Sequence, residues 1–129
     1  MKKFSSLLDN LILTPSRNSK IDLLKDYFSV LDLNKAYALS ILSDQLSFQF
    51  VKASKLRGLV YNKVDKKLFD FSYDYVGDLA ETISLIWPKY NKIKTHSLSL
   101  LVAKIQKLKK NEINTELSKI LDQLSNNER

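Results

Sequence analysis

Glycine and proline are scarce in this sequence, with two of each in 129 residues. Tight connections between strands depend on these residues, so an all-β sandwich or barrel would lack its turns. Hydrophobic residues make up 44% of the chain and charged residues 27%, which favours a packed globule over disorder. The length suits one domain of ordinary size, or a part of a larger one. We therefore expect an all-α bundle of about seven to eight helices.

Several classes of protein are disfavoured by what the sequence lacks. It has no cysteine, and therefore no disulfide framework, thiol nucleophile or zinc ribbon, and its single histidine excludes a histidine-rich metal site. No apolar run approaches the roughly 20 residues that span a bilayer. The N-terminal lysines are not followed by a signal-peptide core, because Asp9 and Asn10 interrupt it. We expect a cytoplasmic protein.

The first half of the chain reads as three helices. Apolar residues from Phe4 onward recur at helical spacing until Pro15 ends the segment. Ser16 or Asn18 can cap the second helix, and Asp32 or Asn34 the third. The buried stripe expected on the second helix comprises Ile21, Leu24, Phe28 and Leu31.

The middle of the chain predicts three further helices. The fourth covers residues 50–63, and a short fifth begins at Asp65. Gly77 breaks the chain, and Asp78 is placed to cap a sixth helix that stops at Pro88. Trp87 is expected to be a buried anchor at that helix end.

The remaining chain divides into a connection, a helical pair and a tail. Residues 89–94 are rich in lysine and are the best candidate for a hinge or loop. Residues 95–125 are expected to form two helices of the same domain, with Lys104, Lys107 and Lys110 opposite the apolar face of the first. Residues 126–129 are expected to be a frayed tail.

Charge is the first functional clue. Lysine and arginine number 21 against 14 acidic residues, which gives a net charge of +7, and a basic balance favours polyanions such as nucleic acid. The charge is unevenly spread, since no acidic residue lies between Glu81 and Glu112 or between Asp44 and Asp65. These stretches are either ordinary solvated surface or strips that follow a phosphate backbone, and charge alone does not choose between them.

Two segments resemble the N-terminal, all-helical DNA-binding domain of ATP-dependent DNA ligases. Residues 72–82, Ser-Tyr-Asp-Tyr-Val-Gly-Asp-Leu-Ala-Glu-Thr, look like that family's Gly-Asp-Leu-Ala/Gly-Glu signature. Residues 13–18, Leu-Thr-Pro-Ser-Arg-Asn, together with Lys20, look like its first helix junction, especially in bacterial members. Residues 37–39 and 86–88 also fall where those members carry similar residues. The resemblance covers residues 1–88 well and the final helical pair loosely.

The resemblance implies sequence-independent binding of nicked double-stranded DNA in repair or replication. Its expected partners are that duplex and, if the gene continues, the catalytic domain of the same ligase. The helix junction offers free backbone N–H groups, hydroxyls and a guanidinium to a phosphate. The residues that we expect to contact DNA are Thr14, Ser16, Arg17, Asn18, Lys20, Lys52, Lys55, Arg57, Lys63, Gly77, Lys104 and Lys107.

The chain also departs from the ligase pattern. A ligase carries AMP on the lysine of a Lys-x-Asp-Gly motif, but the two glycines here, Gly58 and Gly77, follow Arg57 and Val76. This chain alone is therefore not expected to be an enzyme. ATP and Mg²⁺ would belong to the absent catalytic domain. The chain is either a fragment of a ligase or a free-standing remnant.

Other interpretations stay open at this point. The Leu98–Leu124 helical pair could be the docking face of a protein-interaction module, and Gly58 could lie in the turn of a helix-turn-helix regulator. The carboxylates of Asp70, Asp74 and Asp78 are four residues apart and could stack to hold a metal. Gly77 interrupts that helix, however, so we expect no metal site and no catalytic residue. Gly77 itself suits either close approach of a phosphate or a tight turn.

Overall fold

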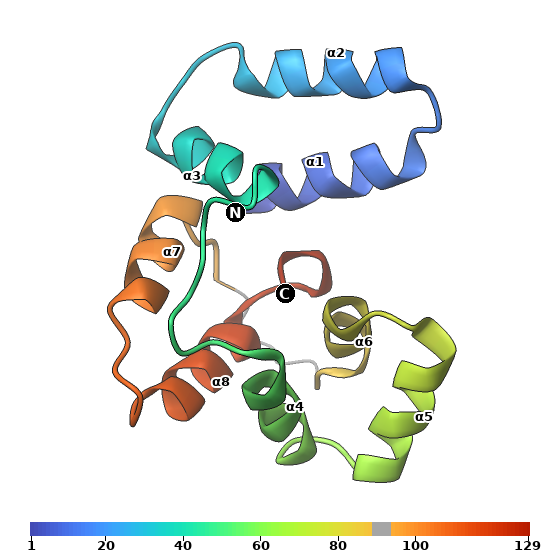
Figure 1. Ribbon diagram of the computed structural model, residues 1–129, viewed down its shortest axis with the longest axis vertical. Coiled ribbons are helices and arrows are strands. Elements are labelled where there is room, and N and C mark those ends of the chain that lie inside the picture. The colour runs from blue at the N-terminus through green and yellow to red at the C-terminus, as the bar shows by residue number, and fades with distance from the viewer. Residues whose placement is uncertain (89–93) are drawn as a thin grey trace. The chain divides into compact units, whose positions relative to one another are not determined.

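The computed structural model describes residues 1–88 and 94–129. In this part of the chain it contains no strand, and the protein is an all-α multi-helix bundle, as the sequence predicts (Figure 1). The elements are α1 (Lys2–Leu13), α2 (Arg17–Phe28), α3 (Leu33–Leu42), α4 (Ala53–Tyr61), α5 (Lys66–Val76), α6 (Leu79–Ile86), α7 (Leu98–Gln106), α8 (Ile113–Gln123) and the 3-10 helix η1 (Asn126–Glu128).

The helices form two compact units. Unit 1 comprises residues 1–47 and 95–104, and unit 2 comprises residues 48–94 and 105–129. The candidate hinge at residues 89–94 lies outside the described residues except for Lys94, whose backbone N–H donates to the carbonyl of Gln123 at 3.0 Å. Helix α7 begins in unit 1, and its last two residues belong to unit 2.

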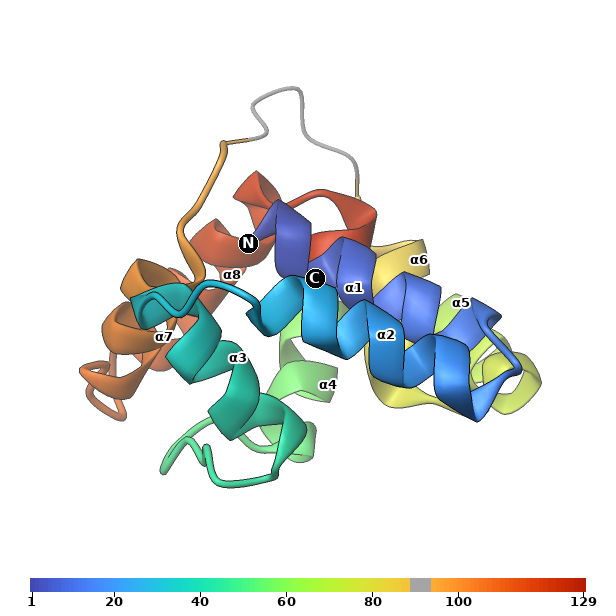
Figure 2. The same ribbon diagram turned by 90° about the horizontal axis from the view of Figure 1, so that it is seen from above.

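In unit 1, α1 and α2 lie side by side and run antiparallel (Figures 1 and 2). Phe4 and Leu7 of α1 are buried, and the ring centroid of Tyr27 on α2 lies 6.3 Å from that of Phe4. The expected buried stripe on α2 is wrong, because no residue of α2 is buried. Leu31 is 75% exposed since the helix ends at Phe28 and the helical spacing no longer applies.

A side chain from α3 caps α7 within unit 1. Asp32 caps α3 by accepting from the backbone N–H of Lys35 at 2.9 Å. Asn34, the other candidate cap of α3, instead accepts from the backbone N–H of Ser99 at 2.9 Å and from the Ser97 hydroxyl at 2.6 Å. One amide oxygen therefore satisfies donors at the N-terminus of a helix more than sixty residues away in sequence.

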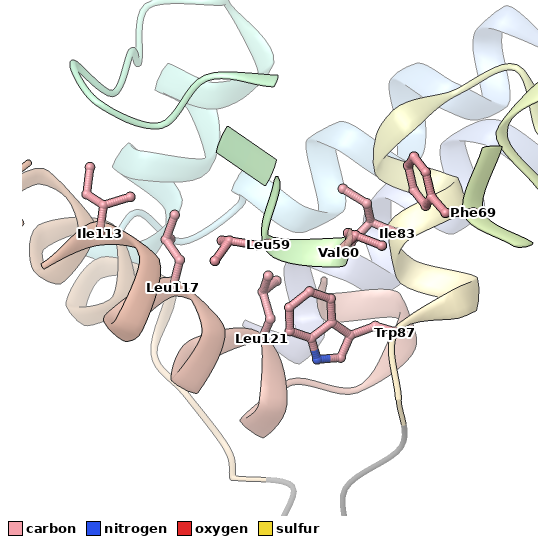
Figure 3. Close-up of a cluster of buried hydrophobic side chains, with 8 residues drawn as sticks. All are labelled: Leu59, Val60, Phe69, Ile83, Trp87, Ile113, Leu117 and Leu121. Atoms are coloured by element: carbon pink, nitrogen blue, oxygen red, sulfur yellow. The ribbon is translucent and has the colours of Figure 1, made fainter. Parts of the chain in front are cut away.

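The core of unit 2 lies where α4, α5, α6 and α8 supply apolar side chains (Figure 3). Trp87 is 2% exposed, which confirms the expected anchor at the end of α6. The core residues are Leu59, Val60, Phe69, Ile83, Trp87, Ile113, Leu117 and Leu121. Three of them belong to the Leu98–Leu124 pair, whose remaining buried residues include Leu98, Leu101 and Leu124. The apolar face of that pair is therefore already covered, and the docking face expected there is wrong.

Helix boundaries differ from the expectations at three places. Helix α4 is shorter than residues 50–63 and contains Gly58 in its interior, so this glycine lies in no helix-turn-helix turn. Helix α7 ends at Gln106, which leaves Lys107 and Lys110 in the following turn rather than on one helical face with Lys104.

The expected fraying of residues 126–129 is also wrong. Ser125 and Glu128 form a reciprocal capping box around η1, and the Glu128 carboxylate is buried. The Arg129 guanidinium donates from Nε to the carbonyl of Leu121 at 2.8 Å. Polar side chains thus order a segment whose composition resembles a solvated tail. No helix in the described residues is long and apolar enough to cross a bilayer.

Candidate nucleic-acid interface

The junction between α1 and α2 is an exposed helix N-terminus. Thr14 ends α1, and its backbone N–H donates to the carbonyl of Asn10 at 3.0 Å. Ser16 caps α2, since its hydroxyl accepts from the backbone N–H of Ser19 at 3.4 Å. The first intrahelical bond joins the N–H of Lys20 to the carbonyl of Ser16. The N–H groups of Arg17 and Asn18 precede it and have no carbonyl within the helix to bind.

The charge at this junction favours an anion. Arg17 and Asn18 are exposed, Lys20 is half-buried, and the first turn of α2 contains no acidic residue. The first carboxylate along α2 is Asp22, which lies 3.9 Å from the Lys25 ammonium. Positive side chains therefore add to the partial positive charge of the helix end, and Thr14, Ser16 and Asn18 supply further polar groups.

Helix α4 carries a second group of predicted contacts, in unit 2. Lys52, the N-cap position, and Lys55 in the first turn are exposed, and α4 has no acidic residue in that turn. Arg57 is half-buried, with its guanidinium carbon 4.4 Å from the centre of the Tyr73 ring. Stacking holds this guanidinium in one place while leaving its N–H groups able to donate.

Lys63 is engaged inside unit 2 rather than presented to solvent. Its Nζ lies 3.2 Å from Asp122 Oδ2 and 5.7 Å from the centre of the Trp87 ring. Three-quarters of each side chain in the Lys63–Asp122 pair is covered. The structure thus gives Lys63 a packing role that its position in an acid-free stretch does not reveal.

Gly77 forms a turn between α5 and α6. Its φ of 79° lies in the left-handed region, which glycine adopts without steric cost. Its N–H already donates to the carbonyl of Tyr73 at 2.8 Å, and the carboxylate of Asp78 follows, capping α6 through the N–H of Glu81. A phosphate would find no spare donor and an adjacent negative charge, so the tight-turn interpretation fits Gly77.

The two predicted contacts at the end of α7 lie in different settings. Lys104 is exposed on α7, within unit 1, whereas Lys107 follows the helix, within unit 2. The predicted contacts therefore belong to two units. The α1–α2 junction and Lys104 lie in one, and the α4 residues, Gly77 and Lys107 lie in the other.

The acidic residues that could have formed a metal site have separate roles. Asp70 accepts from the hydroxyl of Tyr61 at 2.8 Å, and this hydrogen bond is the main reason that the pKa of Tyr61 is raised. Asp78 caps α6. Among residues 1–88 and 94–129, no three histidine, cysteine or acidic residues gather as metal ligands would.

Sequence reasoning missed two polar interactions that organise the chain. Asp122 joins Lys63 to Trp87, and Asn34 caps α7. Their partners are far apart in sequence, so no local signal could have identified them. The imidazole Nε2 of His96 is buried with no hydrogen-bond partner among the described residues, whereas the sequence suggests a solvated or capping histidine.

Comparisons with protein families, curated proteins and solved structures find no match to this chain. The resemblance to DNA ligases therefore rests on the residues quoted above.

Proposed function

We propose that this chain binds double-stranded DNA without sequence preference, as the N-terminal DNA-binding module of an ATP-dependent DNA ligase does in repair and replication. One observation carries the proposal. The segment that resembles the ligase helix junction is an exposed helix N-terminus that has Arg17 at its first position and no acid in its first turn. Such a site binds a phosphate through N–H groups and positive charge, without reading a base.

Helix α4 supports the same proposal in the other unit. Lys52 and Lys55 are exposed near its N-terminus, and the Arg57 guanidinium is fixed over Tyr73. These cations would neutralise further phosphates, and each contact would add to the salt dependence of binding. Lys63 and Gly77 contribute through packing and backbone geometry instead.

The test compares binding to a nicked duplex, an intact duplex and a single strand by fluorescence anisotropy across a salt series. We expect duplex binding that weakens steeply with salt, with a preference for the nick. Reversing two charges at the junction, with Arg17→Glu and Lys20→Glu together, should weaken duplex binding about tenfold or more and lower the salt slope by about two.

A matched control is Lys2→Glu with Lys3→Glu. This pair changes the net charge by the same amount, but it lies at the other end of α1, about 18 Å along the helix. We expect the control to bind DNA far better than the junction variant. Equal weakening in the two variants would reduce the binding to general charge, and absence of duplex binding at low salt would contradict the proposal outright.

A further inference from the structure

An apolar groove lies between α5 and α6. Its volume is about 520 Å³, and Leu68, Phe71 and Tyr75 of α5 face Leu85 and Ile86 of α6 across it. The three α5 residues are spaced at i, i+3 and i+7, which places them on one stripe of that helix. The groove therefore has the pattern of a surface that receives another helix.

The side chains along this groove are unusually exposed for their size. Phe71 is 73% exposed, Tyr75 93% and Leu85 60%. Single exposed apolar residues are ordinary, but an adjoining set on two helices marks an interaction surface. The unit 2 core is on the other side of α5 and α6, where Phe69 and Ile83 are buried, so the groove is a second apolar face of the same hairpin.

The hairpin that carries the groove is acidic in a basic protein. Residues 65–86 contain five carboxylates against two lysines, a net charge of −3, whereas the chain as a whole carries +7. Asp74, Asp78 and Glu81 surround the turn at one end of the groove, and none of them forms an ion pair with another residue in the described parts of the chain. These carboxylates are available to a cationic partner.

We propose that the α5–α6 groove binds a basic amphipathic helix of a partner protein. The apolar stripe of that helix would cover Phe71, Tyr75 and Leu85, and its lysines or arginines would meet the carboxylates at the turn. Helix-in-groove recognition of this kind needs both features, a continuous apolar contact and flanking charges of opposite sign.

The charges disfavour other occupants. DNA would be repelled by the same carboxylates, so this site is separate from the phosphate contacts proposed above and does not depend on them. A second copy docking by two-fold symmetry would place one acidic hairpin against another, with like charges facing. A basic peptide is the occupant whose charge fits, even though the rest of the chain repels it.

The experiment uses the full chain and a fluorescein-labelled helical peptide of leucine and lysine, with all leucines on one face. We expect saturable binding, and weaker binding to a peptide of the same composition in scrambled order. Leu85→Ser should lower the affinity at least about tenfold. The matched control is Leu100→Ser, the same substitution at a site on α7 that is 72% exposed and outside the groove, and it should leave the affinity unchanged. Circular dichroism checks that each variant keeps its helices, and Phe71→Ser provides a second groove variant.

Charge is tested separately with Asp74→Asn and Glu81→Gln together, which should weaken peptide binding and flatten its salt dependence. Equal affinity for the ordered and scrambled peptides, or equal loss in Leu85→Ser and Leu100→Ser, would overturn the proposal. Sedimentation velocity of the protein alone covers the remaining alternative, because a dimer that Leu85→Ser abolishes would make a second copy the occupant.

Discussion

The indole Nε1 of Trp87 donates a 2.9 Å hydrogen bond to Asp122 Oδ1, and Lys63 Nζ lies 3.2 Å from the other carboxylate oxygen. The three residues come from the end of α6, from α8 and from the turn after α4. Because the Trp87 side chain is buried, its N–H has no ready access to water if the carboxylate is removed (Figure 3). Asp122 therefore joins three separate segments of unit 2.

Replacing Asp122 should destabilise unit 2. We expect Asp122→Ala to lower the free energy of unfolding by about 2 kcal/mol, because it leaves a buried indole N–H and a partly covered ammonium without their acceptor. Asp122→Asn keeps an acceptor for Trp87 and should cost about half as much. Urea unfolding followed by the fluorescence of Trp87, the single tryptophan, measures both. Equal stability of the alanine variant and the wild type would contradict this role.

The two glycines should respond to alanine in opposite directions. Gly58 lies inside α4, and an added Cβ would meet no atom within 4 Å, so Gly58→Ala should stabilise the protein by about 0.5–1 kcal/mol. Gly77 also has open space, but its φ of 79° is unfavourable for alanine. Gly77→Ala should therefore cost about 1–2 kcal/mol. Thermal unfolding of the two variants side by side tests the pair, and a loss of stability in both would show that α4 needs flexibility at Gly58.

Local signals in the sequence predicted much of the fold correctly. Ser16, Asp32, Asp65 and Asp78 each cap the helix that follows, and each accepts from a backbone N–H three residues ahead. Such caps depend only on near neighbours, so residue type and spacing are sufficient to identify them.

Interactions between distant residues were beyond sequence reasoning. Lys63 reads as a free surface cation in an acid-free stretch, yet its partner Asp122 is 59 residues away. Asn34 likewise reads as a cap for its own helix, while its amide serves α7. The burial of α2 was overestimated for a related reason, since apolar spacing shows which face could be covered but not whether another element covers it.

Tyr61 should make stability depend on alkaline pH. Its hydrogen bond to Asp70 raises its pKa above the ordinary value of 10.0, so the neutral phenol is favoured in the folded state. A raised pKa means that this stabilisation is complete below pH 10 and is lost as the pH rises through the folded-state pKa. We expect urea unfolding of the wild type to lose stability over this range. Tyr61→Phe should be less stable at neutral pH and lose less between neutral and alkaline pH, and parallel curves for the two proteins would contradict the assignment.

The C-terminal segment should contribute measurable stability although it looks like a tail. The Glu128 carboxylate accepts from the backbone N–H and the hydroxyl of Ser125, at 3.2 and 2.7 Å, and it is buried while doing so. Glu128→Ala removes both acceptors and should cost about 1 kcal/mol, the usual contribution of a capping interaction.

Two further variants separate this cap from other effects of the same segment. Ser125→Ala removes the hydroxyl but keeps the backbone N–H, so it should cost less than Glu128→Ala. Arg129→Ala removes the contact from Nε to the carbonyl of Leu121 without touching the capping box, and its effect should add to that of Ser125→Ala. Urea midpoints of the three variants provide the measurement. A frayed segment would leave all three midpoints at the wild-type value, whereas the ordered η1 turn requires Glu128→Ala to shift furthest of the two capping-box variants.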